Sequence, residues 1–506
     1  MKKIGLIIAV FLFALDASMA QNELDALRYS QRYVDGTARF VGMGGAFGAL
    51  GGDLGALPIN PASAGLFVNR EFSFTPQLIY DNTKAKMLIG KETTSNQANA
   101  FNISNIGYVT SLQTGTSEGV VSLNFGITYN RIADFNQHYE ISGTNTESSM
   151  AYSFLQYANG YKPVDLWEYM ERLAYDTYVI DTDMSDTQYI TGLGSSIEQT
   201  QNKSITTEGG MSELDMNLSA NISNKFYIGA SLGITTVNYK YTGKYSEENN
   251  LLDTNYYDVK YFGLEENLLT SGVGMNLKIG AIFRPVNWAR LGVAFHSGSY
   301  LAINEEYRTS MESEVHYIDA QGNVDAPGYT YHFAEPTDKD GYKLGALVSD
   351  YYIISPGKII LSMALVIKQM ALISVDFEQV NYSRMKMSAL DFNLDNANQA
   401  IIDNFRRTNN LRVGAEIKKG IFSVRGGAIF YDNPLASEDF FINPRNLSLS
   451  AGFGLNQGAF YIDFAIAQQK TQRNDYFYSV PDDFSKVGAQ LTIEKTKALA
   501  TFGIRF

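Results

Sequence analysis

Apolar and polar residues alternate along most of the chain from about residue 70 onward. The clearest stretch is 121–130, where small or polar residues separate Val121, Leu123, Phe125, Ile127 and Tyr129. The same pattern recurs in 214–222, 277–283, 411–417, 447–455 and 460–466. Alternation of this kind predicts β-strands with one apolar face. That face covers a core in a soluble sandwich and meets lipid in a membrane barrel, and the alternation alone does not distinguish the two.

The connections between the predicted strands favour the barrel. Short turns are expected near 223–225, 285–287, 418–420 and 456–458. They alternate with long polar connections at 133–212, 242–272, 300–350, 385–410, 431–446 and 470–486. Outer-membrane barrels have short periplasmic turns and long extracellular loops, whereas a sandwich has no reason for this strict alternation.

The number of predicted strands supports the same architecture. We expect about fourteen strands, and an even number is usual for single-chain bacterial barrels. The count treats 487–506 as one strand, although Glu494-Lys495 also resembles a turn. The predicted strands are 70–80, 103–112, 119–132, 213–222, 226–241, 273–284, 289–299, 351–368, 371–384, 411–418, 421–431, 447–456, 459–470 and 487–506.

Both ends of the chain carry export signals. Lys2 and Lys3 precede an apolar run over 4–15, and Ser18 and Ala20 supply small residues before a cleavage site. We therefore predict a signal peptide over 1–20. At the other end, alternating apolar residues lead to a terminal Phe506, which resembles the C-terminal signal that barrel-assembly machinery recognises. The expected location is the bacterial outer membrane, with its lipid around the barrel.

Composition narrows the function. Among 506 residues, hydrophobic residues make up 45% and charged residues 18%, which is too polar for a helical membrane protein. The chain has 33 tyrosines and 30 phenylalanines, which suit the aromatic girdles of a barrel. The chain contains no cysteine, which excludes disulfides and thiolate chemistry. Its net charge of −13 leaves no basic surface of the kind that binds nucleic acid. No hydrolase or P-loop motif occurs, so we expect no enzyme, catalytic residue, cofactor or metal.

The segment before the predicted barrel carries a specific motif. Residues 40–53 are rich in glycine, and Asn60-Pro61-Ala62 follows, with Gly65-Leu66 after it. This order resembles the FadL-like family of outer-membrane transporters for long-chain fatty acids and other hydrophobic compounds. In that family a Gly-rich plug ends in Asn-Pro-Ala-Gly, whereas here Ser63-Ala64 intervene. The resemblance implies a plug (or hatch) over 21–69 inside a 70–506 barrel of fourteen strands.

The resemblance also implies a transport route with named sites. Asn60, Pro61 and Ala62 belong to the plug motif that gates passage. A ligand released from the plug leaves sideways through a gap that needs a kinked strand, and Gly119 and Gly126 are the candidates. Ordinary packing is the alternative for both glycines.

Two further groups of residues are considered for the ligand. Arg284, Arg412 and Arg425 are candidates to bind a carboxylate head group, or else they pair with acids in the lumen. In the loop 133–212, Pro163 and the apolar positions 166, 167, 170, 173 and 174 predict a helix. That helix either packs on the barrel mouth or forms an apolar groove that collects substrate.

Two functions fit these features. The first is passive transport of hydrophobic small molecules, with long-chain fatty acids as the reference, through a plugged barrel with lateral release. The alternative is a FadL-like barrel that serves as a surface docking component of a protein secretion system. The first expects a small apolar ligand, and the second expects an accessory protein chain.

Overall fold

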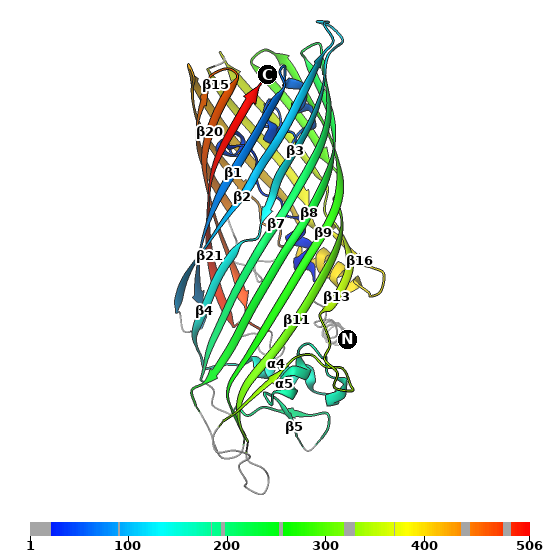
Figure 1. Cartoon of the computed structure of the whole chain (residues 1–506), viewed down its shortest axis with the longest axis vertical. Helices are drawn as coiled ribbons and strands as arrows, with labels where there is room; N and C mark the ends of the chain where they lie inside the picture. Colours follow the sequence, from blue (N-terminus) through cyan, green and yellow to red (C-terminus); the bar gives the residue numbers. More distant parts are fainter. Residues whose placement is uncertain are drawn as a thin grey trace, which may run out of the picture.

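The computed structural model describes residues 22–89, 92–183, 185–193, 198–251, 257–317, 329–368, 370–436, 446–478 and 487–506. The predicted signal peptide lies outside these residues. The chain forms a closed antiparallel barrel of 14 strands with 5 extra strands, which confirms the predicted fold class. The barrel closes where β1 (Glu71–Met87) pairs with β21 (Gly488–Arg505). The strands run obliquely around a long cylinder (Figure 1).

The strands and helices have the following bounds. The other strands are β2 (Thr93–Gln113), β3 (Val120–Asp134), β4 (Gln137–Asn145), β5 (Asp181–Thr182), β6 (Tyr189–Ile190), β7 (Gln199–Ile222), β8 (Phe226–Asn249), β9 (Tyr257–Val286), β10 (Ala289–His296), β11 (Tyr300–Tyr317), β12 (Thr330–Ala334), β13 (Leu347–Ile354), β14 (Lys358–Ile367), β15 (Ala371–Asn381), β16 (Lys386–Ala389), β17 (Arg407–Lys419), β18 (Phe422–Tyr431), β19 (Asn446–Asn456) and β20 (Phe460–Tyr476). The helices and 3₁₀ turns are α2 (Glu23–Ser30), α3 (Ala38–Gly42), η1 (Leu54–Ala56), η2 (Pro61–Leu66), α4 (Met150–Ala158), η3 (Pro163–Asp165), α5 (Glu171–Asp176), η4 (Tyr382–Arg384) and α6 (Asp395–Asn404).

Some barrel strands consist of two segments in line. β3 and β4 both pair with β7, and β10 and β11 both pair with β9. β13 pairs with β11, and β14 pairs with β10. On their other sides, β13 pairs with β16 and β14 pairs with β15. Short turns lie at the end of the barrel where the C-terminus also lies, and we call this the turn end. The opposite end carries α4 and α5 and is the loop end (Figure 1).

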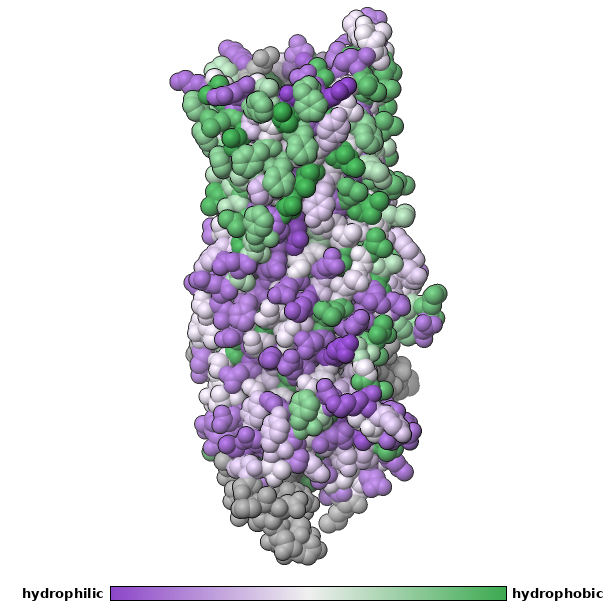
Figure 2. All heavy atoms as spheres, viewed as in Figure 1, coloured by the Kyte–Doolittle hydropathy of each residue, from purple (hydrophilic) through white to green (hydrophobic). Residues whose placement is uncertain are grey.

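The side-chain pattern inverts along the barrel wall. On β8, the outward residues from Phe226 to Ile234 are apolar, a length that matches the roughly 9–11 residues a tilted strand needs to cross a bilayer. Farther along, the outward residues are polar, and inward Val237, Tyr239 and Tyr245 are buried. Figure 2 shows the result as an apolar band toward the turn end and a polar surface toward the loop end.

This inversion corrects the predicted loops. The range 242–272 contains the ends of β8 and β9, and 300–350 contains β11, β12 and part of β13. The ranges 133–212 and 385–410 also contain strand residues, including those of β4 and β7. Past the apolar band, outward positions need to be polar because they meet water, so the strands read as polar loops. The range 487–506 is one strand, as predicted.

The N-terminal segment, 22–69, packs against the inside of the wall. Its α3 contacts β18, β19, β20 and β21, while η2 contacts β3, β7, β8 and β9. Figure 1 shows this segment within the barrel, in blue. Wall glycines allow the close approach, because a Cβ on Gly280 would collide with the Asn60 side chain and one on Gly427 with the backbone of Gly44. We call 22–69 the interior segment.

The predicted loop helix is only partly correct. Pro163 begins η3, but the chain turns at Leu166 and a second helix, α5, starts at Glu171. The structure adds α4, which the sequence reading missed. Residues of α4 and α5, and Leu166 directly after η3, pack into a core of buried apolar residues at the loop end, together with inward residues of the wall. In the part of the chain that the structure describes, no helix is both long and apolar enough to cross a membrane.

Candidate functional site

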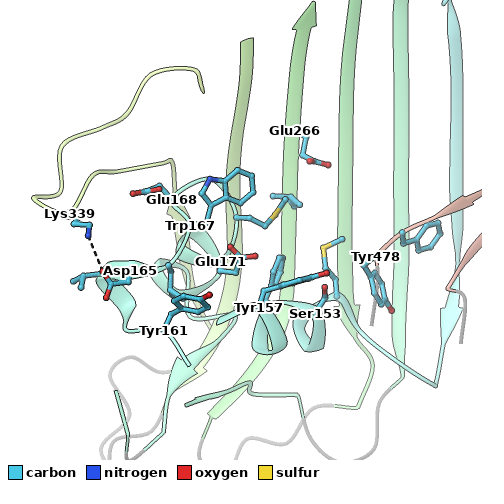
Figure 3. A pocket seen from close by; sticks show the side chains of 17 residues that line it. Ser153, Tyr157, Tyr161, Asp165, Trp167, Glu168, Glu171, Glu266, Lys339 and Tyr478 are labelled. Carbon is cyan, nitrogen blue, oxygen red and sulfur yellow. Dashed lines mark hydrogen bonds and ion pairs between the residues drawn. The ribbon is translucent and has the colours of Figure 1, made fainter. Parts of the chain in front are cut away.

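A pocket of about 610 Å³ lies at the loop end, between α4, η3, α5 and the barrel wall. We call it the mouth pocket. Figure 3 shows side chains from the helices and from the wall pointing into it. A volume in this range suits a small organic ligand. Its lining residues are Met150, Ser153, Phe154, Tyr157, Tyr161, Val164, Asp165, Leu166, Trp167, Glu168, Met170, Glu171, Leu264, Glu266, Lys339, Phe477 and Tyr478.

A second pocket, of about 390 Å³, lies farther inside the barrel. We call it the interior pocket. It is bounded by α2 of the interior segment and by inward residues of the wall, among them Tyr239 and Phe135. Several of its charged groups are already paired: Arg32 with Glu213, Lys495 with Asp134, and Lys497 with Asp35. The pairs of Arg32 and Asp35 hold the interior segment to the wall, whereas Lys495–Asp134 joins two strands of the wall.

The barrel wall has a break beside the interior pocket. The pairing of β2 with β3 ends at Asn105 and Asn130, so β2 from Thr93 to Ser104 has no backbone pairing on this side among the described residues. On the other side of the break, β3 shifts register between Arg131 and Ala133, and β4 begins only at Gln137. We call this break the seam.

Polar contacts hold the seam in its present form. The Asn102 amide donates to the Asp134 carboxylate across it at 3.2 Å, and Lys495 pairs with the same carboxylate at 3.1 Å. The interior segment also takes part, because the Tyr33 N–H donates to the Ile132 carbonyl at 2.9 Å. The interior segment is therefore hydrogen-bonded directly to the edge of the seam.

The predicted plug motif holds the end of the interior segment in place. Asn60 caps η2 by accepting from the Ala62 N–H at 3.1 Å. Its amide donates to the Gly48 carbonyl at 2.7 Å and reaches the Ala281 carbonyl of the wall at 3.3 Å. The Pro61 carbonyl accepts from Asn217 of β7 at 3.1 Å. The intervening Ser63-Ala64 are part of η2 and are buried.

The two glycines proposed for a kink lie elsewhere than the seam. Gly119 is in the turn before β3 with a φ of +71°, a conformation that favours glycine. Gly126 lies in a stretch of β3 that pairs continuously with β2 and β7. A Cβ there would contact the Leu57 side chain of the interior segment. The register shift nearest the seam is at Arg131 and Ala133 instead.

The three arginines proposed for a carboxylate head group take up different contacts. Arg425 donates to Glu416 and Asp463, both at 2.5 Å, and Arg412 donates to Glu378 at 2.8 Å. Arg284 donates to Asn287 in the turn that follows β9. None of the three is among the described residues that line the mouth pocket or the interior pocket. Arg412 and Arg425 thus pair with acids in the lumen, the alternative that the sequence left open.

Comparison with known proteins bears on this arrangement. No protein-family model and no curated protein matches the chain. The toluene transporter TodX of P. putida matches with a TM-score of 0.51 at 10% identity, over 94% of this chain and 99% of TodX. A Pseudomonas aeruginosa FadL homologue matches with a TM-score of 0.52 at 12% identity, over 94% of this chain and 100% of the homologue. The chain has the FadL-type barrel fold.

The FadL-type fold was predictable from the N-terminal motif and the strand pattern, but the main site residues were not. The reading of 163–174 found Leu166, Trp167 and Met170, which line the mouth pocket. The sequence analysis did not identify Asp134 and Phe135 of the seam. They fell in a predicted loop that began at 133, and no local sequence signal marks the point where pairing between two strands ends. The carboxylates that line the mouth pocket form no sequence motif, because Glu266 is far along the chain from Glu168 and Glu171.

Proposed function

We propose that this chain is an outer-membrane barrel that passes hydrophobic small molecules by a passive, lateral route. A ligand enters the mouth pocket, moves to the interior pocket, and leaves through the seam into the outer leaflet. The interior segment acts as the plug that blocks a straight aqueous path. The predicted signal peptide and C-terminal strand direct export and assembly by the barrel-assembly machinery.

The observation that carries this proposal is the position of the seam. Asp134, Phe135 and Gln137 line the interior pocket and also form the broken edge of the wall. An apolar ligand in that pocket is therefore next to the one interruption that we find between β2 and β3 in the described residues. A sideways exit into lipid keeps an apolar solute away from water, which the hydrophobic effect favours.

Filling the mouth pocket tests the route. Ser153 of α4 lines this pocket, and we expect Ser153→Trp to occupy the space that a ligand needs. Uptake of radiolabelled decanol by cells that express the variant is expected to fall about tenfold, the change that corresponds to about 1.4 kcal/mol of lost binding. Heat-modifiable gel migration confirms that the variant barrel is folded.

Ser185→Trp is the matched control, because Ser185 is exposed at the loop end and is not among the residues that line the pocket. Equal uptake by the parent and Ser153→Trp, with both barrels folded, would show that the mouth pocket is not on the path.

A further inference from the structure

The mouth pocket contains three carboxylates that have no cationic partner. Glu168 and Glu171 come from the loop that holds η3 and α5, and Glu266 comes from β9. In the view of Figure 3, Glu168 lies to the left of Trp167, Glu266 to its upper right and Glu171 below it. No salt bridge joins any of the three to a described Lys, Arg or His. Glu266 accepts a hydrogen bond from the neutral Tyr307 hydroxyl at 2.7 Å.

The cations near this pocket are engaged by other groups. Lys339 pairs with Asp165 at 3.2 Å. Arg172 pairs with Asp176 at 2.8 Å and donates to the Pro163 carbonyl. Burial raises the pKa of the Glu171 carboxyl, whereas a close cation would lower it. An anionic ligand in this pocket would thus meet like charge and no free donor cation.

The rest of the lining is aromatic. Trp167, Tyr157 and Tyr161 face the pocket from the loop, and Phe477 and Tyr478 face it from the end of β20. Aromatic faces attract organic cations, tryptophan most strongly, and they also accept the apolar body of a ligand. Carboxylates beside aromatic rings therefore form a site for a molecule that is both apolar and positively charged.

We propose that the mouth pocket selects apolar molecules that carry a protonated amine or quaternary ammonium group, over carboxylates or sulfonates of the same size. This inference rests on the proposed transport function and names the substrate class of its first site. It differs from the long-chain fatty acid expected from the family resemblance. The attraction comes from Glu168, Glu171 and Glu266 together with the Trp167 face.

The two tryptophans of the chain make a direct binding test possible. Trp167 lines the mouth pocket, while Trp288 lies exposed in the turn after β9 at the other end of the barrel. In a Trp288→Phe protein, held in a neutral detergent, tryptophan fluorescence reports on the pocket alone. The probes are bromophenylpropyl compounds that end in trimethylammonium, hydroxyl or sulfonate, because bromine quenches a tryptophan in contact.

We expect saturable quenching by all but the sulfonate, with the ammonium probe binding about tenfold more tightly than the alcohol. The triple variant Glu168→Gln, Glu171→Gln, Glu266→Gln should remove this preference while still binding the alcohol. A matched triple, Glu208→Gln, Glu248→Gln, Glu306→Gln, changes the net charge equally on the outer wall and should keep the preference.

Two other outcomes overturn different claims. Equal or tighter binding of the sulfonate probe, with the alcohol also bound, would contradict the charge preference and leave the transport proposal standing. Absence of quenching by every probe would contradict the role of the mouth pocket, and with it both proposals.

Discussion

A reversible cross-link across the seam is expected to stop the release of ligand. Asn102 and Asp134 face each other across this break and are joined by a hydrogen bond of 3.2 Å. In the double variant Asn102→Cys, Asp134→Cys, a short bis-methanethiosulfonate ties the two edges together. Uptake should fall at least about tenfold, since a barrier raised by about 1.4 kcal/mol slows a rate by that factor. The chain contains no cysteine of its own, so the reagent reacts only with the two introduced thiols.

Reduction of the same sample supplies the internal control, because it restores a free seam while both substitutions remain. A second double variant, Tyr108→Cys, Ile127→Cys, places the cross-link between directly opposed residues of the same strands where the ladder is intact. That cross-link should leave uptake unchanged. Undiminished uptake by the cross-linked seam would mean that the ligand leaves by another path.

Displacement of the interior segment is expected to turn the barrel into an open pore. A Cβ at Gly280 of β9 would collide with the Asn60 side chain and come within 3.1 Å of the Pro61 ring. Gly280→Val therefore forces η2 away from the wall while β9 keeps its pairing. Ionic conductance in a planar bilayer should rise at least about tenfold over the parent, because an emptied barrel of this size leaves a water-filled lumen.

Gly426→Val is the matched substitution, since a Cβ at Gly426 of β18 meets nothing within 4 Å. Its conductance should equal that of the parent. If Gly280→Val also stayed closed, with new trypsin cleavage after Arg39 showing that the interior segment had moved, then something other than this segment would block the lumen.

The sequence predicted the membrane half of this barrel well because lipid on the outside and polar groups on the inside impose a strict alternation. Phe226 and Ile228 on β8 face outward, while Ser231 and Thr235 face inward among the lumen polar groups. Beyond Thr236 the outer face meets water and its outward residues are polar. The alternation of apolar and polar residues that marks a lipid-facing strand is therefore lost, and the sequence of the strand resembles that of a loop. Turn residues, terminal aromatics and the Asn60 motif are local signals, and all were visible in the sequence.

The site was less predictable because it depends on contacts between distant segments. The seam exists because β3 shifts register near Ala133 and the Ile132 carbonyl binds Tyr33, about a hundred residues earlier in the chain. The sequence left open whether Arg425 binds a ligand or pairs with acids in the lumen, and its partners Glu416 and Asp463 come from β17 and β20. The carboxylates of the mouth pocket converge from a loop and from β9, and no spacing along the chain indicates this.

Native mass spectrometry tests the central claim most directly. The mature protein is released from a neutral detergent after incubation with a mixture of apolar amines, alcohols and acids, and bound molecules are identified by extraction. Our account predicts one or two apolar small molecules per barrel, with amines enriched, and their loss in Ser153→Trp. A barrel that retains no small molecule but keeps a second protein chain would contradict it and would favour docking for secretion.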